Sequence, residues 1–437
     1  MTNLLIQNAT LPSGEVADIA IVGEKIVAVG KALAADSAGA NATVIDATGL
    51  VALPGLVDLH THLREPGFEQ SETIYTGSQS AAAGGFTAVH AMANTSPVQD
   101  TAGVVEQVQR LGQEAGYVDV VPVGAVTVGL EGKQLAELGA MANSRARVRV
   151  FSDDGKCVHD PVLMRRALEY VKTFGGVVAQ HAQEPRLTEG AQMNEGKVSA
   201  DLGLTGWPAV AEESIIARDV LLAEHVGSRV HICHLSTAGS VDIIRWAKAR
   251  GINVTAEVTP HHLLLTDELV RSYDAVYKVN PPLRTQEDVL ALRAALVDGT
   301  IDIIATDHAP HPAESKDCEW QAAAFGMLGL EIAASVAQDV LIDSGASDWN
   351  RVAAVLSSNP AKIGLLEEQG QPLVAGSVAN LTLIDPKAKR VIEHSHSKSE
   401  NNPYRGLTLP GAVVHTIYRG YQTVTNGQLA EKGRPNA

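Results

Sequence analysis

The sequence has little cysteine, no long apolar run and no excess of positive charge. Its three cysteines are far apart and form no CxxC pair, which argues against a disulfide framework and for reduced thiols in the cytoplasm. The most apolar stretch, AAAGGFTAVHAMA, is broken by glycines and a histidine, and no run approaches the ~18 residues of a membrane span. The initial MTNLLIQNATLPSG has neither the basic region nor the long apolar region of a signal peptide. These absences predict a soluble cytoplasmic protein.

The charge balance excludes a second group of functions. The chain has 34 lysines and arginines against 50 aspartates and glutamates, which gives a formal net charge of −16. Nucleic acids and anionic membrane surfaces both require a basic footprint, so neither is expected as the main partner. A local basic pocket for a small acid remains compatible with this composition. At 437 residues the chain is long enough for one large catalytic domain and an accessory unit.

Both ends of the chain have the pattern of short strands separated by glycine-rich turns. One interpretation is a single small β-sandwich built from residues 1–54 and 367–437. The alternative is two unrelated β appendages. The polar stretch HSHSKSENNPYRG (394–406) is predicted to be a surface loop.

The middle of the chain, residues 55–366, alternates apolar β-branched runs with helical stretches. The helical stretches include DPVLMRRALEYVKTFG, EESIIARDVLLAEHVG and QEDVLALRAALVDG, and they end in glycine as helices often do. Eight strand candidates across about 250 residues are typical of a (β/α)8 barrel. An open doubly wound sheet is the alternative, but the glycine-rich phosphate turn expected after its first strand is missing. The candidates are 55–60, 86–94, 118–126, 146–154, 176–181, 229–234, 253–260 and 301–308.

Polar residues follow the ends of five of these strand candidates. In a (β/α)8 barrel the carboxyl ends of the strands face one mouth, where active sites are built. Strand alternation also sends the two histidines of a His-Thr-His stretch to one face. All the residue types concerned bind zinc through nitrogen or oxygen. They are His60, His62, Asp153, Asp154, His181, His234 and Asp307.

Each of these residues has an ordinary structural alternative. Taken alone, His234 would more often be a hydrogen-bonded core residue, and Asp307 a helix N-cap. Either aspartate of the DDG turn would suit a turn cap. A second HxH pair, His394 and His396, lies in a polar stretch and is interpreted as solvated surface. Because the first set falls at five strand ends together, a metal site is the better interpretation.

Such a set supports hydrolytic chemistry. His60, His62 and Asp307 are able to hold one divalent ion, and His181 and His234 a second, with one aspartate of the DDG turn as the bridge. Two ions ~3.5–4 Å apart share a water, lower its pKa and create hydroxide near neutral pH. Asp307 beside that water is suited to take its proton and pass it to a leaving nitrogen. Spacing alone does not separate a carbonyl centre from a phosphoryl centre.

Seven motifs carry a resemblance to one enzyme family. They are HTHLREPG (60–67), AMANTSPVQD (91–100), FSDDGKCVHDP (151–161), HICHLSTAGS (231–240), EVTPHHLLL (257–265), KVNPPLR (278–284) and ATDHAPH (305–311). Together they resemble dihydroorotases of the bacterial type I branch, in the amidohydrolase superfamily. The resemblance covers nearly the whole chain, and it is specific because related cyclic-amide hydrolases depart at HLREPG.

The resemblance implies a reaction, a cofactor and a set of site residues. The reaction is reversible cyclisation of N-carbamoyl-L-aspartate to (S)-dihydroorotate with release of water, the third step of de novo pyrimidine synthesis. The family pattern implies one or two Zn2+ ions, a metal-bound hydroxide that attacks the ring amide carbonyl, and Asp307 as general acid/base. The implied metal ligands are His60, His62, Asp154, His181, His234 and Asp307. The implied substrate contacts are His62, Arg64, Asn94, Asn280, His311 and the backbone around Phe325 and Gly326.

The chemistry of the substrate agrees with these contacts. Both reactant and product carry a carboxylate, and Arg64 offers a planar two-pronged donor two residues beyond a metal ligand. The structural alternatives are an ion pair between Arg64 and Glu65, and a turn role for Asn280 before its prolines. The segment ESKDCEWQAAAFG (314–326) is a candidate lid.

The metal bridge departs from the wider superfamily. Many relatives use a carboxylated lysine on the fourth strand, where this chain has FSDDG. Asp154 is preferred to Asp153 as the bridge because its spacing to His181 fits the family pattern. Lys156 is disfavoured because it lies two residues beyond the strand end. One and two zinc ions both remain open.

Two rival functions and two partner hypotheses also remain. A hydantoinase, dihydropyrimidinase or allantoinase acts on a neutral ring, which gives Arg64 nothing to bind. A non-catalytic scaffold of aspartate transcarbamoylase is expected to have lost ligands, and all six implied ligands are present here. A homodimer, and association of an active enzyme with aspartate transcarbamoylase, are not decided by the sequence.

Overall fold

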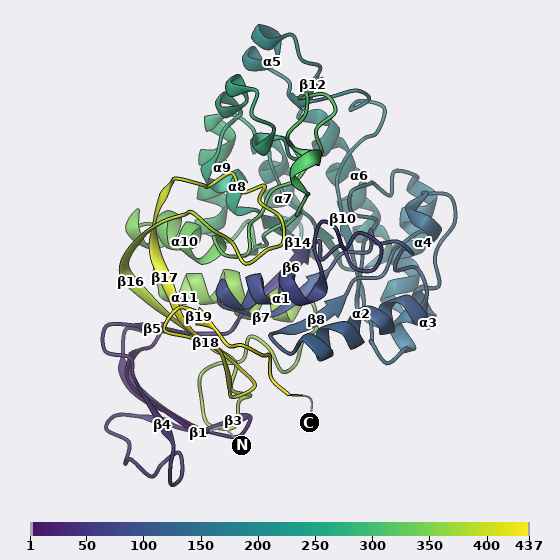
Figure 1. Ribbon diagram of the computed structural model, residues 1–437. Coiled ribbons are helices and arrows are strands. Elements are labelled where there is room, and N and C mark those ends of the chain that lie inside the picture. The colour runs from purple at the N-terminus through teal and green to yellow at the C-terminus, as the bar shows by residue number, and fades with distance from the viewer. Residues whose placement is uncertain (1–2, 436–437) are drawn as a thin grey trace.

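The computed structural model describes residues 3–435, so residues 1–2 and 436–437 of the predicted terminal units lie outside the described residues. The chain is an α/β protein, as the sequence predicts. Strands from the two chain ends lie side by side, and the middle of the chain supplies parallel strands surrounded by helices (Figure 1).

The strands of both chain ends belong to one nine-stranded sheet, in which β4 pairs with β1 beside the main path β19-β18-β17-β16-β5-β1-β2-β3. β5 is antiparallel to β16, with Ala52 opposite Leu383, and this pairing joins the two ends. The sheet buries an apolar core that includes Leu4, Ile19 and Leu381. The two chain ends thus contribute strands to one sheet. The strands are β1 (Asn3–Thr10), β2 (Val16–Val22), β3 (Lys25–Gly30), β4 (Thr43–Asp46), β5 (Val51–Pro54), β16 (Leu381–Val391), β17 (Thr408–Tyr418), β18 (Tyr421–Thr425) and β19 (Gln428–Leu429).

Eight parallel strands follow in the middle of the chain, and each overlaps one of the eight strand candidates. They form a three-stranded sheet, β6-β7-β8, and a five-stranded sheet, β15-β14-β13-β10-β9. Two single parallel bridges, Gly124 to Phe151 and Thr61 to His308, connect these sheets. The strands are β6 (Leu56–Thr61), β7 (Phe86–Ala91), β8 (Asp119–Pro122), β9 (Val150–Phe151), β10 (Val177–Gln180), β13 (Val230–Ile232), β14 (Val254–Val258) and β15 (Ile303–Ile304). A separate pair consists of β11 (Met193–Asn194) and β12 (Gly206–Trp207).

Helices lie outside the parallel strands, and local sequence explains where several of them begin and end (Figure 1). The Asp160 carboxylate accepts hydrogen bonds from the N–H groups of Val162 and Leu163 at the start of α4. Gly227 and Gly299 end α6 and α9 with φ of 65° and 86°, which glycine adopts without strain. The α-helices are α1 (Ile74–Ala83), α2 (Ala102–Ala115), α3 (Leu138–Asn143), α4 (Pro161–Lys172), α5 (Lys197–Leu202), α6 (Val210–Val226), α7 (Ala238–Ala249), α8 (Pro260–Leu264), α9 (Gln286–Asp298), α10 (Ala333–Ala337), α11 (Trp349–Ala353) and α12 (Asn359–Ile363). Short 3₁₀ or π turns are η1 (Val128–Leu130), η2 (Asp267–Ser272), η3 (Ala275–Tyr277), η4 (Ala313–Ser315), η5 (Gln338–Asp343) and η6 (Ala354–Ser358).

Side chains from several parallel strands meet in one buried apolar cluster. It includes Leu59 of β6, Val150 of β9, Val177 of β10 and Ile303 of β15. Because this space is filled by apolar groups, the polar residues that follow the strands are left at the carboxyl ends.

The 394–406 stretch is only partly the surface loop that the sequence predicts. His394 and His396 are exposed, but residues 401–404 are buried. The Ser399 hydroxyl and the Asn401 side chain bond to the protein, because the segment crosses from the terminal sheet to the loops that follow β6 and β15. We call residues 397–404 the strap.

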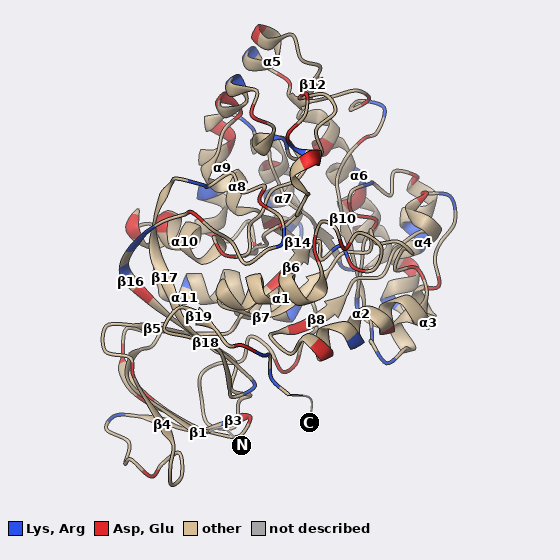
Figure 2. Ribbon diagram, in the orientation of Figure 1, with Lys and Arg blue, Asp and Glu red and all other residues tan. Residues whose placement is uncertain are grey.

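Acidic and basic residues are mixed along the helices (Figure 2). Exposed ion pairs such as Arg165–Glu169 on α4 and Arg245–Asp298 between α7 and α9 belong to this pattern. Within residues 3–435, none of the helices combines the length and the apolar character that crossing a membrane requires.

Candidate active site

Histidines and aspartates from several strand ends converge in one buried cluster. The His62 Nε2 atom lies 3.0 Å from Asp307 Oδ1 and 3.2 Å from Asp154 Oδ2. The His60 Nε2 atom lies 3.3 Å from Asp154 Oδ1 and 3.5 Å from Asp307 Oδ1. None of these four residues is more than 5% exposed. The two aspartates therefore face the same pair of histidines.

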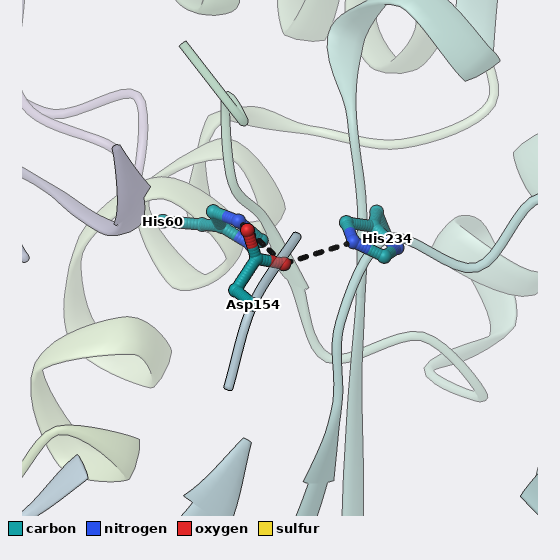
Figure 3. A group of neighbouring side chains, drawn as sticks. All are labelled: His60, Asp154 and His234. Carbon is teal, nitrogen blue, oxygen red and sulfur yellow. Dashed lines mark hydrogen bonds and ion pairs between the residues drawn. The ribbon is translucent and has the colours of Figure 1, made fainter. Parts of the chain in front are cut away.

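The other two predicted histidine ligands reach Asp154 as well. The His181 Nδ1 atom lies 3.2 Å from Asp154 Oδ1 and 2.9 Å from His234 Nε2. The His234 Nε2 atom lies 3.4 Å from the same Asp154 oxygen. Figure 3 shows this oxygen between the rings of His60 and His234. Asp154 thus lies between the two predicted pairs of histidines, where a bridge would be needed.

The two alternatives to Asp154 lie elsewhere. The Asp153 carboxylate accepts hydrogen bonds from the N–H groups of Val126 and Thr127, at 2.8 and 3.0 Å, and from the Thr127 hydroxyl. Lys156 is exposed. In the DDGK stretch, Asp154 is the residue that faces the histidines.

Several site residues have backbone conformations that residues with side chains rarely adopt. The φ angles are 30° at His234, 47° at Asp307 and 63° at Arg64. Such conformations cost on the order of 1–3 kcal/mol each, and they persist where the surrounding structure enforces them. Here they occur at strand ends, where the chain must leave the sheet while its side chains stay in the site.

The donor set fits a divalent cation. The His60 Nε2 atom is buried and has no hydrogen-bond partner among the described residues, although carboxylates lie on two sides of it. Burial opposes protonation of His60, yet the charges of Asp154, Glu257 and Asp307 raise its pKa well above the ordinary value. The negative potential that has this effect also favours a cation, and histidine with carboxylate suits zinc and neighbouring divalent metals. Three groups have donor atoms within 4.8 Å of one another: His60, His62 and Asp307; His60, Asp154 and His234; and His60, Cys233 and Glu257.

Glu257 of β14 lies behind His60 and is absent from the residues that the sequence predicts for the site. Its Oε1 atom lies 2.6 Å from His60 Nδ1, and its Oε2 atom 2.9 Å from His231 Nε2. The His231 Nδ1 atom in turn lies 2.8 Å from Thr255 Oγ1. A carboxylate in this place makes His60 present Nε2 to the aspartates. Cys233 lies on the same side of the ring, where burial raises the pKa of its thiol.

Gln183 holds His181 in a similar way and was also missed. Its Oε1 atom lies 2.8 Å from His181 Nε2, so the ring presents Nδ1 to Asp154. The same oxygen accepts a 3.1 Å hydrogen bond from Asn280 Nδ2. The Asn280 Oδ1 atom is buried and has no hydrogen-bond partner among residues 3–435, which leaves it free to accept a hydrogen bond.

Arg64, Asn94 and His311, three predicted substrate contacts, lie beside the cluster. The Asn94 Oδ1 atom is 2.9 Å from His62 Nδ1. The Arg64 Nε group donates to the Pro310 carbonyl at 3.1 Å, and Nη2 lies 3.3 Å from His311 Nε2. Burial lowers the pKa of Arg64 to about 10, so the arginine stays charged at neutral pH. Burial and the Arg64 charge lower the pKa of His311 to about 3, so His311 is neutral.

Phe325 and Gly326 approach the site through their backbone. The Phe325 carbonyl oxygen lies 2.8 Å from His311 Nε2, and the Gly326 N–H donates to the Lys278 carbonyl at 3.0 Å. Gly326 has a φ of 148°, and a Cβ there would lie 2.8 Å from the His311 ring. Only glycine allows this close approach.

The predicted lid, residues 314–326, is held by hydrogen bonds from two lysines, the half-buried Lys316 and the buried Lys278. The Lys316 ammonium donates to the carbonyls of Ala324 and Lys278 at 2.7 and 3.0 Å. The Lys278 ammonium donates to the Trp320 carbonyl at 2.6 Å. In this structure the segment is therefore anchored beside the site.

The fold and the site together define a class of protein. Parallel strands carry a His-X-His pair, two further histidines and two aspartates at their carboxyl ends, and these residues include candidate groups of metal ligands. The solved structure of a dihydropyrimidinase from Brevibacillus agri matches this chain with a TM-score of 0.84 and 26% sequence identity, over 99% of this chain and 100% of that one. The chain is a metal-dependent amidohydrolase.

Sequence comparisons narrow the class to one family. A family model described as Dihydro-orotase-like matches residues 49–240. A dihydroorotase of Leifsonia xyli is 68% identical over 98% of this chain and 97% of its own length. A dihydroorotase of Streptomyces coelicolor is also 68% identical, over 98% of this chain and 100% of its own length. The chain belongs to the dihydroorotase family, and it is an enzyme of the cyclic-amide hydrolase type.

Replacing Glu257 should weaken metal binding. Glu257→Gln removes the charge that holds His60 Nδ1 and leaves the side chain similar in size. Loss of such a partner typically lowers metal affinity by about 10- to 100-fold. Competition between the purified variant and a metal-buffering chelator measures this directly. Asp219→Asn is the control, because Asp219 is a buried carboxylate that bonds Gln180 and Arg218. Equal metal affinity in the Glu257 variant and the unmodified protein would contradict a positioning role.

Proposed function

We propose that the chain hydrolyses (S)-dihydroorotate to N-carbamoyl-L-aspartate and catalyses the reverse cyclisation, as the third step of de novo pyrimidine synthesis. The observation that carries this proposal is Arg64, a half-buried cation at the edge of a cluster of histidines and carboxylates suited to a metal and to hydrolysis. A cation in this position serves a substrate that carries a carboxylate next to its reacting amide. The 68% identity to dihydroorotases over nearly the whole chain supports the same substrate.

We propose a closed (β/α)8 barrel for residues 55–366 and a β-sandwich formed by residues 1–54 and 367–437. The bridges Gly124–Phe151 and Thr61–His308 support closure, because they connect the two parallel sheets at both of their edges. The pairing of β5 with β16 supports a single terminal domain.

We propose zinc as the metal, with one or two ions per subunit and Asp154 as the bridge. When bound, the metal lowers the pKa of a water molecule and polarises the amide carbonyl. The position of Asp154 between both histidine pairs supports the bridge. The proposed ligands are His60, His62, Asp154, His181, His234 and Asp307.

Asp307 is the proposed general acid/base. Burial opposes its ionisation, but the neighbouring His60 and His62 lower the pKa of Asp307 to about 2. Asp307 is therefore a carboxylate at neutral pH and accepts a proton from the attacking water. As the ring C–N bond breaks, its carboxyl group returns that proton to the leaving nitrogen, and ring closure follows the same path in reverse.

The remaining site residues hold the substrate. Arg64 donates to the substrate carboxylate, and Asn94 and His311 flank it. The unpartnered Oδ1 atom of Asn280 accepts a ring N–H. His62, and the backbone of Phe325 and Gly326, complete the proposed set.

The proposal includes a cytoplasmic location, supported by free cysteines, two of which are buried, Cys157 and Cys233. A homodimer and an association with aspartate transcarbamoylase are partner hypotheses within it. Size-exclusion chromatography of the chain alone and with that enzyme separates these hypotheses.

Chelation should abolish hydrolysis of dihydroorotate, and Zn2+ should restore it, because both water activation and carbonyl polarisation depend on the metal. The assay compares dihydroorotate with dihydrouracil, hydantoin and allantoin, before and after metal removal. Zinc-dependent activity on dihydroorotate alone is the expected result. Activity on a neutral ring instead would keep the metal centre and overturn the substrate.

A further inference from the structure

We infer that Asn401, in the strap, is a positioning residue for the pocket that binds the substrate carboxylate. The inference rests on the proposed function, since it assigns this residue to the Arg64 side of that site. Asn401 follows β16 of the terminal sheet, far along the chain from the strand-end residues, yet its side chain is only 4% exposed.

The Asn401 side chain joins two loops of the site. Its Nδ2 group donates to the carbonyls of Ala309 and Gly326, at 2.9 and 3.1 Å. Its Oδ1 atom accepts a 3.0 Å hydrogen bond from the His311 N–H. The Asn401 carbonyl accepts a further bond from the Leu328 N–H, at 3.1 Å. The loop after β15 and the end of the predicted lid are thus fixed relative to each other through one amide.

These two loops carry the groups next to Arg64. The His311 Nε2 atom lies 2.8 Å from the Phe325 carbonyl oxygen and 3.3 Å from Arg64 Nη2. A cavity of about 440 Å³ has His311, Asn401 and Asn402 in its wall. A shift of either loop moves His311 relative to Arg64, and a displacement of about 1 Å in a binding site costs up to about 10²-fold in rate.

Hydrogen bonds also hold the N-terminal end of the strap, so the position of Asn401 is fixed from both sides. The Ser399 hydroxyl donates to the Ser71 carbonyl at 2.6 Å. The Lys398 N–H donates to Glu72 Oε1 at 3.0 Å. Because Ser71 and Glu72 follow β6, the strap connects the loop after β6 to the loop after β15.

The chain offers a matched pair of variants. Asn401→Asp keeps the acceptor for His311 but replaces the donor with an oxygen that faces two carbonyl oxygens. Asn402→Asp adds the same charge one residue away and keeps the Oδ1 atom that accepts a 3.0 Å bond from the Tyr404 N–H. Asn402 is also buried, at 8% exposure. Asn401→Asp therefore removes the hydrogen bonds that join the loop after β15 to the end of the predicted lid, and Asn402→Asp leaves them in place.

The measurement is kcat and KM for dihydroorotate hydrolysis, together with bound zinc and thermal midpoint. For Asn401→Asp we expect KM to rise about 10-fold or more, because two buried hydrogen bonds are lost and two carbonyls face an oxygen. We expect kcat to change less than KM, and bound zinc to equal that of the unmodified enzyme. Asn402→Asp should keep KM within about 2-fold. If the Asp variant does not fold, Asn401→Ser removes the same donor without adding charge and should show the same rise in KM.

Four outcomes overturn the inference. Unchanged KM in a folded Asn401 variant would show that the link does not matter for binding. An equal rise in KM in the Asn401 and Asn402 variants would show a general structural effect. A loss of bound zinc that matches the loss of activity would show the same. An unmodified enzyme that binds zinc but does not hydrolyse dihydroorotate would instead overturn the proposed function, and the inference with it.

Discussion

Asp307→Asn should lower kcat for dihydroorotate hydrolysis by roughly 10²- to 10⁴-fold, the contribution typical of a positioned general acid/base. The amide cannot take the proton of the attacking water, and it cannot return one to the ring nitrogen. The other two carboxylates nearest to it within residues 3–435 are already engaged by histidines. Asp154 is held among four histidines, and Glu257 bonds His60 on the far side of the ring. Steady-state kinetics in both directions of the reaction measure the loss.

Metal content separates the proton-transfer role of Asp307 from its ligand role. An asparagine side-chain oxygen still binds zinc, so the variant should retain at least one ion per chain, and kcat should fall in the metal-loaded protein. Asp153→Asn is the charge-matched control, because Asp153 bonds the backbone of Val126 and Thr127 and not the histidines. The Asp153→Asn variant should be less stable, with little change in the kcat of the metal-loaded protein. Retention of near-normal turnover in the Asp307 variant would contradict the general acid/base assignment.

The strand ends could be predicted because parallel strands impose a simple geometry. Eight short apolar runs determine where the sheet strands lie, and carboxyl ends of parallel strands share one edge. His60 and Asp307 are therefore expected to lie close together, although they are far apart in the sequence. The bridge between Thr61 and His308 brings them together. The placement depends on alternation and strand order, both of which are visible in the sequence.

Glu257 was missed although the sequence contains a usable signal. It is an acidic residue inside the apolar strand VTAEV, and burial of an unpaired carboxylate costs several kcal/mol. A buried partner was therefore required, and the histidines His60 and His231 supply it. Gln183 gives a weaker signal, since it lies only two residues after His181 and glutamine is common in loops.

Asn401 and the strained strand ends could not be predicted in this way. The strap has the composition of a solvated loop, and its burial depends on how the terminal sheet lies against the parallel strands. The positive φ angles of Arg64, His234 and Asp307 are likewise imposed by the surrounding structure, because these residue types do not favour them. Contacts that depend on tertiary packing produce no periodic pattern of residues from which they could be predicted.

Arg64→Ala should lower kcat/KM for dihydroorotate by about 10²-fold or more, mainly through KM. Truncating one partner of a buried charge pair costs roughly 2–5 kcal/mol, and here the other partner is the substrate carboxylate. The arginine is held by its 3.1 Å bond to the Pro310 carbonyl and lies beside His311 before substrate binds. Arg64→Lys should recover little of the lost kcat/KM, because lysine keeps the charge but loses the two-pronged geometry and the Nε donor.

A neutral ring makes this test specific. Dihydrouracil has the reacting amide without the carboxylate, so the Arg64→Ala variant should turn it over at nearly the unmodified rate. Where that turnover is too slow to measure, competitive inhibition gives the same comparison: binding of orotate should weaken strongly, and binding of uracil should not. Bound zinc should be unchanged, since Arg64 contributes no metal ligand. If both ligands weakened equally, Arg64 would be acting through the loops at Pro310 and His311, and the carboxylate would have to be bound elsewhere.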